Sequence, residues 1–290
     1  MTTVLECIDA GTADLEKRGV EDARRNMQFL VAHHLQCTRM QLYLRFDEPL
    51  GENILVPLRV DLKKRGERVP LQHLLGTVPF HQMDFKVDGR ALIPRPETEE
   101  LVEWLIANVL PPPATVLDLG CGSGVIGLSL AAAWPEAQVT LADVSPEALS
   151  LTKENASALG LERVRFCETS LFSQISDRFD LIVANLPYVP EADRATLTPE
   201  VLYDPALALF SGADGLDLIR EFCQQAKHFL RPNGMIAMEI GHDQAEATSA
   251  LLLAGGLCDV RVMTDISGIA RFPLAKLPPN PNADAAGATS

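Results

Sequence analysis

The chain has 290 residues, enough for one large domain or two smaller ones. Its 39 acidic residues outnumber its 25 basic residues, so the formal net charge is -14. Affinity for nucleic-acid phosphates usually requires a basic surface. The charge therefore argues against a protein that binds nucleic acid directly.

The N-terminal stretch has neither the basic flank and apolar core of a secretory signal nor the Arg-rich, acid-free composition of a transit peptide. The longest weakly polar stretch, 116–134, contains an aspartate and four glycines, which a membrane helix avoids. The six cysteines are scattered, without a C-x-x-C pair or a Cys/His cluster, so we expect no metal site and no disulfide framework. These features predict a cytoplasmic protein with reduced thiols and no membrane partner.

The first 76 residues are expected to form a small helical domain. Apolar residues recur at three- and four-residue spacings from Asp22 to Leu35. A second apolar stripe runs from Ile54 to Lys64, where Pro57 is tolerable only in the first turn of a helix. A short segment, 71–75, then ends at Gly76, a helix stop.

Residues 77–113 are expected to link this domain to the next. The pattern from Val78 to Val87 indicates an extended hairpin. Two prolines, Pro94 and Pro96, hold the next segment extended, and a helix follows to about Val109. The three consecutive prolines at 111–113 form a stiff break.

From residue 114 to 276, short apolar runs alternate with segments of helical length. This alternation is typical of a doubly wound α/β sheet. Two further strands, near 259–263 and 270–274, have little between them and are expected to pair antiparallel at the sheet edge. The Pro/Asn/Ala/Gly-rich tail, 277–290, is expected to be disordered. The expected central strands are 115–119, 138–142, 164–167, 179–184 and 235–240, and the expected helices are 125–133, 146–159 and 216–230.

The first strong functional signal follows the strand at 115–119. An apolar run ends in Asp118, and glycines at every second position lead into a helix. Glycines there permit a tight turn and let a ligand lie against bare backbone at a helix N-terminus. The pattern D-x-G-x-G-x-G suits a nucleoside joined to an amino acid better than a pyrophosphate. The turn consists of Gly120, Cys121, Gly122, Ser123 and Gly124.

This stretch resembles the S-adenosylmethionine-binding motif of the seven-stranded Rossmann-like methyltransferases. An acid at the end of the second strand, Asp143, fits hydrogen bonds to both ribose hydroxyls. The resemblance implies that the glycine turn lines the methionine end of the cofactor. It also implies that the end of the third strand flanks the adenine, where Leu171 is the expected apolar contact. Relatives commonly have aspartate where Ser170 stands.

The second signal lies at the end of the fourth strand, where the chain reads Asn185-Leu186-Pro187-Tyr188. A planar amide or aromatic amine is a poor nucleophile because its lone pair is delocalised. The Asn185 side-chain oxygen and the Leu186 carbonyl can each accept one N–H, which orients the nitrogen toward a methyl donor. Pro187 restricts the residue before it to extended conformations, and Tyr188 can pack its face on the planar group. Positioning of this kind supplies most of the mechanism.

The motif resembles the [N/D]-P-P-Y of methyltransferases that act on planar nitrogens, with Leu186 in place of the first proline. Together with the segment Leu92-Ile93-Pro94-Arg95-Pro96-Glu97-Thr98-Glu99-Glu100 and with Glu239-Ile240-Gly241, the chain looks like the release factor glutamine methyltransferases. That resemblance spans about residues 20 to 275. It implies a helical N-terminal domain, a hairpin linker and a methyltransferase sheet. It further implies S-adenosylmethionine-dependent methylation of the side-chain amide N5 of glutamine in the Gly-Gly-Gln motif of peptide chain release factors.

Three alternatives remain open from the sequence. A ribosomal-protein glutamine N5-methyltransferase ranks second, because that family usually departs from R-P-x-T-E. A nucleic-acid adenine N6-methyltransferase shares the target motif, but it is disfavoured by the charge and by the lack of a Lys/Arg-rich recognition segment. A cofactor-binding scaffold without turnover is the third, because Leu186 departs from the motif at a residue whose carbonyl is expected to orient the target nitrogen. The long, proline-punctuated stretch 189–214 is expected to form a partly ordered lid.

Overall fold

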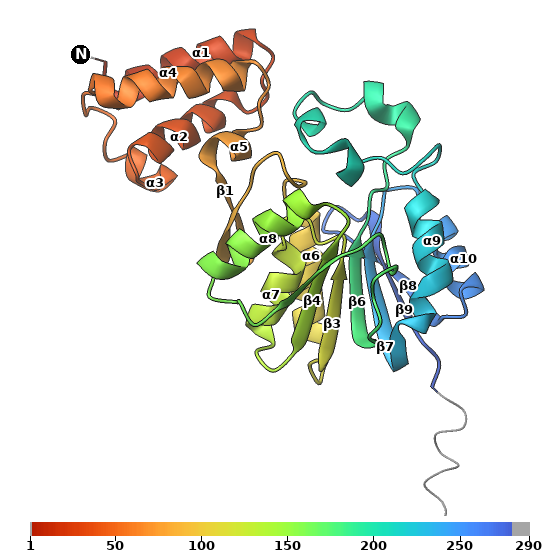
Figure 1. Cartoon of the computed structure of the whole chain (residues 1–290). Helices are drawn as coiled ribbons and strands as arrows, with labels where there is room; N and C mark the ends of the chain where they lie inside the picture. The colour runs from red at the N-terminus through yellow and green to blue at the C-terminus, as the bar shows by residue number, and fades with distance from the viewer. Residues whose placement is uncertain (1, 280–290) are drawn as a thin grey trace, which may run out of the picture. The chain divides into compact units, whose positions relative to one another are not determined.

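The computed structural model describes residues 2–279 and forms two compact units (Figure 1). The first unit comprises the chain up to Val78 together with Val87–Gly89 and Thr198–Tyr203. The second comprises Pro79–Lys86, Arg90–Leu197 and the chain from Asp204 onward. The tail predicted from residue 277 lies outside the described residues from position 280 on.

The first unit is a helical bundle around one apolar core, as the sequence predicts. Ile8, Leu30 and Leu58, which come from three different helices, are buried in this core. Thr3 caps the first helix in a capping box with Glu6, which satisfies backbone N–H groups at the helix start. The helices are α1 (Val4–Lys17), α2 (Ala23–His34), α3 (Arg39–Leu42), α4 (Glu52–Gly66) and α5 (Leu71–Leu75).

Helix α4 differs from the prediction at Pro57. The helix begins at Glu52, so Pro57 lies inside it rather than in its first turn, and that expectation was wrong. Because proline has no N–H, the carbonyl of Asn53, four residues earlier, receives no helical hydrogen bond. Asn53 is exposed, so water can satisfy that carbonyl, while Leu55 and Leu58 hold the helix against the core.

The segment Thr198–Tyr203 belongs to the helical unit although it comes from far along the chain. Glu200 accepts hydrogen bonds from Arg65 Nη2 at 2.9 Å and from Arg68 Nε at 2.6 Å. The Arg65 side chain is 7% exposed. Since a buried guanidinium needs a counter-ion, Glu200 supplies the charge that makes its burial tolerable.

The second unit is built on a seven-stranded sheet of order β5-β4-β3-β6-β7-β9-β8. The first five strands in this order pair in parallel, and β9 and β8 add an antiparallel edge. The α/β fold and the antiparallel pair are therefore confirmed. The strand order reverses at β3, where open sheets bind ligands at the carboxyl ends of their strands. The strands are β3 (Thr115–Leu119), β4 (Gln138–Asp143), β5 (Arg165–Glu168), β6 (Phe179–Asn185), β7 (Leu230–Glu239), β8 (Cys258–Thr264) and β9 (Ala270–Lys276).

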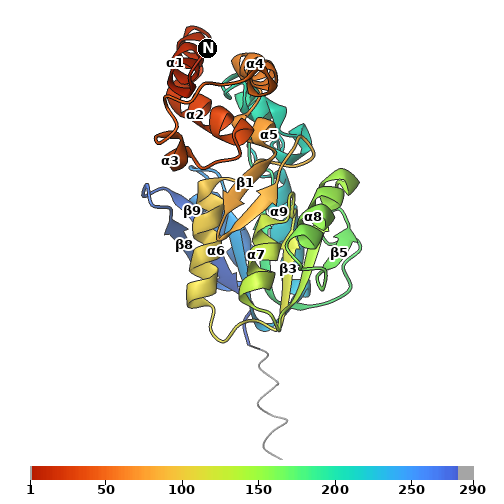
Figure 2. The ribbon, with the colours of Figure 1, turned by 90° about the vertical axis from the view of Figure 1, so that its left-hand side faces the viewer.

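Helices cover both faces of the sheet. Figure 2 looks onto the face covered by α6 (Pro96–Asn108), α7 (Val125–Ala133) and α8 (Pro146–Ala158). In Figure 1, α9 (Asp217–Gln225) and α10 (Ala245–Ala254) lie on the opposite face. The hairpin of β1 (Thr77–Phe80) and β2 (Met83–Lys86) confirms the extended pattern predicted there, and short 3-10 turns occur at 191–195, 201–203, 206–208 and 226–228. Within residues 2–279, the helices are too short or too polar to span a membrane.

Strand β7 is longer than predicted. The sequence predicts this strand from Met235, directly after a Pro-Asn-Gly run that is typical of a turn. In the structure, Leu230 pairs with Phe179 and a register shift follows between Phe179 and Leu181. Long-range pairing to β6 therefore adds five residues to the strand, and α9 correspondingly ends earlier than expected.

Candidate active site

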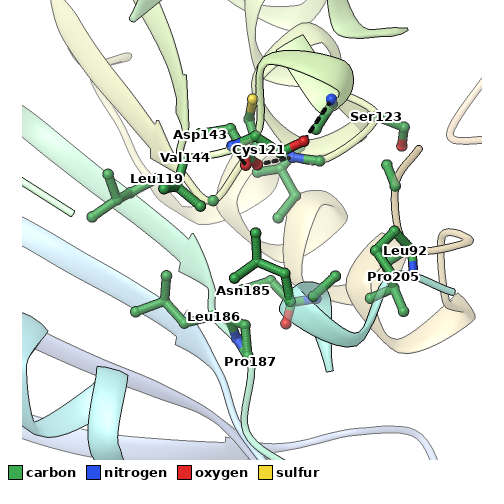
Figure 3. A pocket seen from close by; sticks show the side chains of 18 of the residues that line it. Leu92, Leu119, Cys121, Ser123, Asp143, Val144, Asn185, Leu186, Pro187 and Pro205 are labelled. Carbon is green, nitrogen blue, oxygen red and sulfur yellow. Dashed lines mark hydrogen bonds between the residues drawn. The ribbon is translucent and has the colours of Figure 1, made fainter. Parts of the chain in front are cut away.

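A cavity of about 230 Å³ opens at the carboxyl ends of β3, β4 and β6. Figure 3 shows Cys121 and Asp143 along one wall, with Asn185 and Leu186 across from them. The structure thus brings the two predicted signals, the glycine turn and the target motif, to one cavity. The sequence-predicted residues that line it are Gly120, Cys121, Gly122, Ser123, Asp143, Leu171, Asn185, Leu186 and Pro187.

The glycine turn is held against the end of β4. The N–H groups of Gly120 and Cys121 both donate to the carbonyl of Ala142, at 2.8 and 3.0 Å. Gly120 has a φ of +76°, and a Cβ added there would lie 3.2 Å from Leu186 Cδ2. Glycine at this position therefore permits both the backbone conformation and the close approach of the two strand ends. Gly124, also predicted for the cofactor, is the N-cap of α7 and lies outside the cavity lining.

Asp118 lies beneath the turn rather than in the cavity wall. Its side chain is fully buried, and Oδ2 accepts a hydrogen bond from the Gly127 N–H at 2.8 Å. Its other oxygen has no hydrogen-bond partner within residues 2–279. Burial raises the pKa of this carboxyl to about 7, because the charged form is poorly solvated there. The geometry gives Asp118 a role in holding the turn and the start of α7.

Asp143 ends β4 and faces the cavity. Its Oδ2 accepts from the Gly122 N–H and its Oδ1 from the Ser145 N–H, each at 2.9 Å. Burial raises the pKa of this carboxyl, and hydrogen bonds from the backbone N–H groups of Ser145, Gly122 and Val144 oppose that rise. A carboxylate offers about four lone-pair sites, more than these backbone donors occupy, so acceptor capacity remains for a ligand that carries hydroxyl groups.

The end of β5 supplies a mixed wall, in which Ser170 and Leu171 line the cavity. Leu171 is 7% exposed and has a φ of +46°, an uncommon conformation for leucine. The Thr169 hydroxyl donates to the Leu171 carbonyl at 3.0 Å and so supports this turn. The turn holds an apolar side chain at the cavity wall, as expected for a contact to a planar ring.

Asn185 is the last residue of β6 and is linked to two buried side chains that the sequence reasoning did not single out. Its Nδ2 donates to Thr98 Oγ1 at 3.3 Å, and Thr98 Oγ1 donates to Glu239 Oε2 at 2.6 Å. Burial raises the pKa of Glu239, while the hydrogen bonds from Thr98 and Asn185 and the charge of Arg271 lower it. Both residues lie in segments that carried the family resemblance, and this was the one available signal for them.

Leu186, the departure from the usual proline, is 4% exposed and belongs to the apolar core of the second unit while also touching the cavity. Its side chain packs close to Gly120. A buried leucine loses its freedom to reorient. Packing therefore restrains this position where a proline ring would restrain it covalently.

Tyr188 lies outside the cavity lining. Its ring packs against the core, and its hydroxyl is 3.5 Å from Glu239 Oε1, a long contact. Burial, followed by the nearby charge of Glu239, raises the pKa of the phenol. The carbonyl of Tyr188 accepts from Gln244 Nε2 at 2.9 Å, which fixes the backbone after the target motif.

Other residues complete the cavity without having been predicted for it. Leu92, Pro94 and Arg95 come from the segment before α6, and Pro205 and Leu207 come from the predicted lid. Asp204 joins these two segments, because it accepts from the Ile93 N–H at 3.2 Å and from Arg95 Nη2 at 2.8 Å. The sequence signal that could have identified Leu92, Pro94 and Arg95 is the extended Pro-x-Pro segment to which they belong or which they precede.

Comparison with known proteins yields two family matches and close relatives. Residues 98–214 match the methyltransferase small domain, and residues 6–76 match the PrmC N-terminal domain. The chain is 41% identical to a release factor glutamine methyltransferase of Geobacter sulfurreducens, over 93% of this chain and 95% of the relative. It is 40% identical to one of Deinococcus radiodurans, over 93% and 97% respectively.

Solved structures share the fold at low sequence identity. A methyltransferase from Pyrococcus furiosus is 15% identical with a TM-score of 0.51, over 78% of this chain and 98% of that one. The 16S rRNA N2 G1207 methyltransferase of T. thermophilus is 18% identical with a TM-score of 0.51, over 69% and 49%. At these identities the likeness supports the fold alone.

Proposed function

The chain belongs to the release factor glutamine methyltransferase family, and we propose that it transfers a methyl group from S-adenosylmethionine to the side-chain amide N5 of the Gly-Gly-Gln glutamine in peptide chain release factors. One observation carries the proposal: a single cavity joins the glycine turn and Asp143 on one wall to Asn185 and Leu186 on the other. Donor and acceptor can therefore meet within one cavity.

The residues present fit the cofactor. Asp143 retains acceptor capacity for the ribose hydroxyls, and Leu171 offers an apolar contact for the adenine. Gly120 and Gly122 present bare backbone for the methionine end, and Asp118 supports the turn from below through Gly127. When bound, S-adenosylmethionine supplies an electrophilic methyl group on a positively charged sulfur.

The target motif orients the amide that is methylated. Asn185 Oδ1 and the Leu186 carbonyl each accept one N–H of the glutamine amide, which directs the nitrogen lone pair at the methyl group. Pro187 and the buried Leu186 side chain keep the loop in place, and Tyr188 supports it from the core side. No strong base is needed, because the nitrogen becomes acidic only as it is methylated. Holding the atoms at near-attack distance supplies most of the rate.

Labelled cofactor tests this proposal. The protein is incubated with methyl-labelled S-adenosylmethionine and release factor, ribosomal protein or nucleic acid, and the label is located. Label on the Gly-Gly-Gln glutamine is the expected result. Label on a ribosomal-protein glutamine or on adenine would replace the proposal by one of the alternatives, and cofactor binding without transfer would favour a scaffold.

Asn185→Ala provides the matched variant. It should abolish transfer while leaving cofactor binding measurable, because Asn185 ends β6 on the wall opposite Asp143. Asn108→Ala, an exposed residue at the end of α6, is the control and should keep full activity. A fully active Asn185→Ala would contradict the proposed amide orientation.

In the same proposal, the helical unit docks the release factor. That unit exposes apolar side chains on and after α3, with Met40 at 72% and Leu44 at 89% exposed. Leu44→Asp should raise the KM for whole release factor without changing the affinity for cofactor. Leu253→Asp, at a leucine 57% exposed on α10, is the control. Equal KM values for both variants and the unmodified chain would contradict docking through this surface.

A further inference from the structure

A line of buried polar side chains runs from the target motif through Thr98, which also lines the cavity, to Glu239, which does not. Asn185 donates to Thr98, and Thr98 donates to Glu239. Thr98 is 3% exposed and Glu239 is 1% exposed, and the transfer chemistry described above uses neither. Burying such groups is costly unless they are hydrogen-bonded, so their arrangement needs a reason.

We propose that Thr98 and Glu239 are positioning residues that fix the orientation of the Asn185 amide, so that its Oδ1 faces the substrate nitrogen. The inference rests on the proposed function, because it concerns how the same target amide is held. Neither residue needs to touch the substrate.

The direction of the hydrogen bonds carries the inference. The Thr98 Oγ1 to Glu239 Oε2 distance of 2.6 Å is typical of a hydroxyl that donates to an ionised carboxylate. A carboxylate accepts only, and a hydroxyl has one proton, so the Thr98 proton is committed to Glu239. The Thr98 oxygen is then left to accept, and it accepts from Asn185 Nδ2.

The consequence is a defined amide orientation. The two ends of an asparagine amide have nearly the same shape, so hydrogen bonding decides which end points where. With Nδ2 turned toward Thr98, the acceptor oxygen is the end that remains for a ligand in the cavity that Asn185 lines. A substrate amide that donates its N–H groups needs an acceptor there.

The fold places these groups together from three elements. Asn185 at the end of β6 lies opposite Glu239 at the end of β7 in the parallel register. Thr98 is in the first turn of α6, two residues after the second proline of the Pro-x-Pro segment. The carboxyl of Glu239 also lies 3.5 Å from the Tyr188 hydroxyl, so one buried group faces two residues of the target motif. Glu97 and Arg271 are the further charges that act on it.

Three variants of the full chain test the proposal. Thr98→Val keeps the shape and removes both the donor and the acceptor, whereas Thr98→Ser keeps the hydroxyl and is the matched control. Glu239→Gln keeps the shape but can donate to Thr98, which frees the hydroxyl proton to bind Asn185 Oδ1 and lets the amide turn over. We expect kcat for release factor to fall about 10- to 100-fold in Thr98→Val and Glu239→Gln. The affinity for S-adenosylmethionine should change less than about two-fold in all three, since only the transition-state contact is lost.

The outcomes discriminate orientation from simple structural support. Equal losses in Thr98→Val and Thr98→Ser, or a folded Glu239→Gln with unchanged kcat, would overturn the proposal. If Glu239→Gln does not fold, the comparison of kcat between Thr98→Val and Thr98→Ser tests the proposal. If the wild-type protein transfers the labelled methyl group to a substrate other than release factor, the proposed function is contradicted. The kcat of each variant relative to wild type, measured on that other substrate, would still test the inference.

A second measurement does not depend on turnover. The side-chain amide protons of Asn185, assigned in NMR spectra by their loss in Asn185→Ala, should exchange slowly with solvent in the wild type and in Thr98→Ser. In Thr98→Val they should exchange at least about ten-fold faster, because the Thr98 oxygen that accepts from Asn185 Nδ2 is gone. Equal exchange rates in the valine and serine variants would contradict the hydrogen bond on which the inference depends.

Discussion

Replacing Asp118 with asparagine should raise the free energy of unfolding of the cofactor-free chain, relative to the wild type, progressively as the pH rises. Asp118 is fully buried in β3, with one oxygen on the Gly127 N–H and the other without a partner within residues 2–279. Burial raises the pKa of its carboxyl from 3.8 to about 7. Between these values the folded chain keeps a proton that the unfolded chain releases. The wild type is therefore not destabilised by Asp118 below the lower pKa. It loses free energy of unfolding as the pH rises from the lower pKa toward the higher one.

The magnitude follows from the size of the shift. Relative to low pH, the raised pKa of Asp118 lowers the free energy of unfolding of the wild type by about 4 kcal/mol at about pH 8. At about pH 5 the same loss is only about 1.6 kcal/mol. In Asp118→Asn the side chain cannot ionise, and its unpaired N–H costs about 1–3 kcal/mol at every pH. The difference in the free energy of unfolding between variant and wild type should therefore grow by about 2.5 kcal/mol from about pH 5 to about pH 8.

Urea unfolding of both proteins at several pH values, without cofactor, measures this difference. All other groups titrate in both proteins, so the pH dependence of the difference isolates Asp118. A constant difference across the range would show that Asp118 is ionised at low pH in the folded chain, and it would refute the reasoning from burial.

Three further changes probe other parts of the molecule. Asp143→Ala should weaken binding of S-adenosylmethionine at least about ten-fold in calorimetry, because charge-assisted bonds to two hydroxyls contribute about 1.5–3 kcal/mol each. Unchanged affinity would remove Asp143 from the proposed ribose site. Leu186→Ala should lower the free energy of unfolding by about 2–5 kcal/mol, because the side chain is 4% exposed and leaves a cavity in the core. A loss of kcat without any loss of stability would show that Leu186 acts in some way other than packing. Glu200→Gln should destabilise the helical unit by about 1–3 kcal/mol near neutral pH, because it leaves the buried Arg65 without its counter-ion. Burial acts to raise the pKa of Glu200, but hydrogen bonds from Arg68 and Arg65 lower it to about 2, so the difference from wild type should shrink as the pH falls from about 4.5 toward 2. A difference that stays constant through this range would contradict the ion pair.

The sequence by itself determined the features that depend on local pattern. Short apolar runs alternating with segments of helical length predicted the strands and helices of the sheet, and the glycine run predicted the turn after β3 because only glycine adopts its backbone conformation readily. Asp143 and Asn185 could be placed at one site because parallel strands in a doubly wound sheet end at the same edge. Local chemistry and one topological rule were therefore sufficient to identify both walls of the cavity.

The tertiary structure alone decided which polar groups support those walls. Thr98 and Glu239 are 141 residues apart, and nothing in either local pattern relates them. The burial of Asp118 beneath the turn, the packing of Leu186 into the core and the joining of Thr198–Tyr203 to the helical unit are likewise long-range outcomes. The physical reason is common to all of them: burial and hydrogen-bond direction depend on which distant residues close the space around a side chain, and a local sequence pattern does not record this.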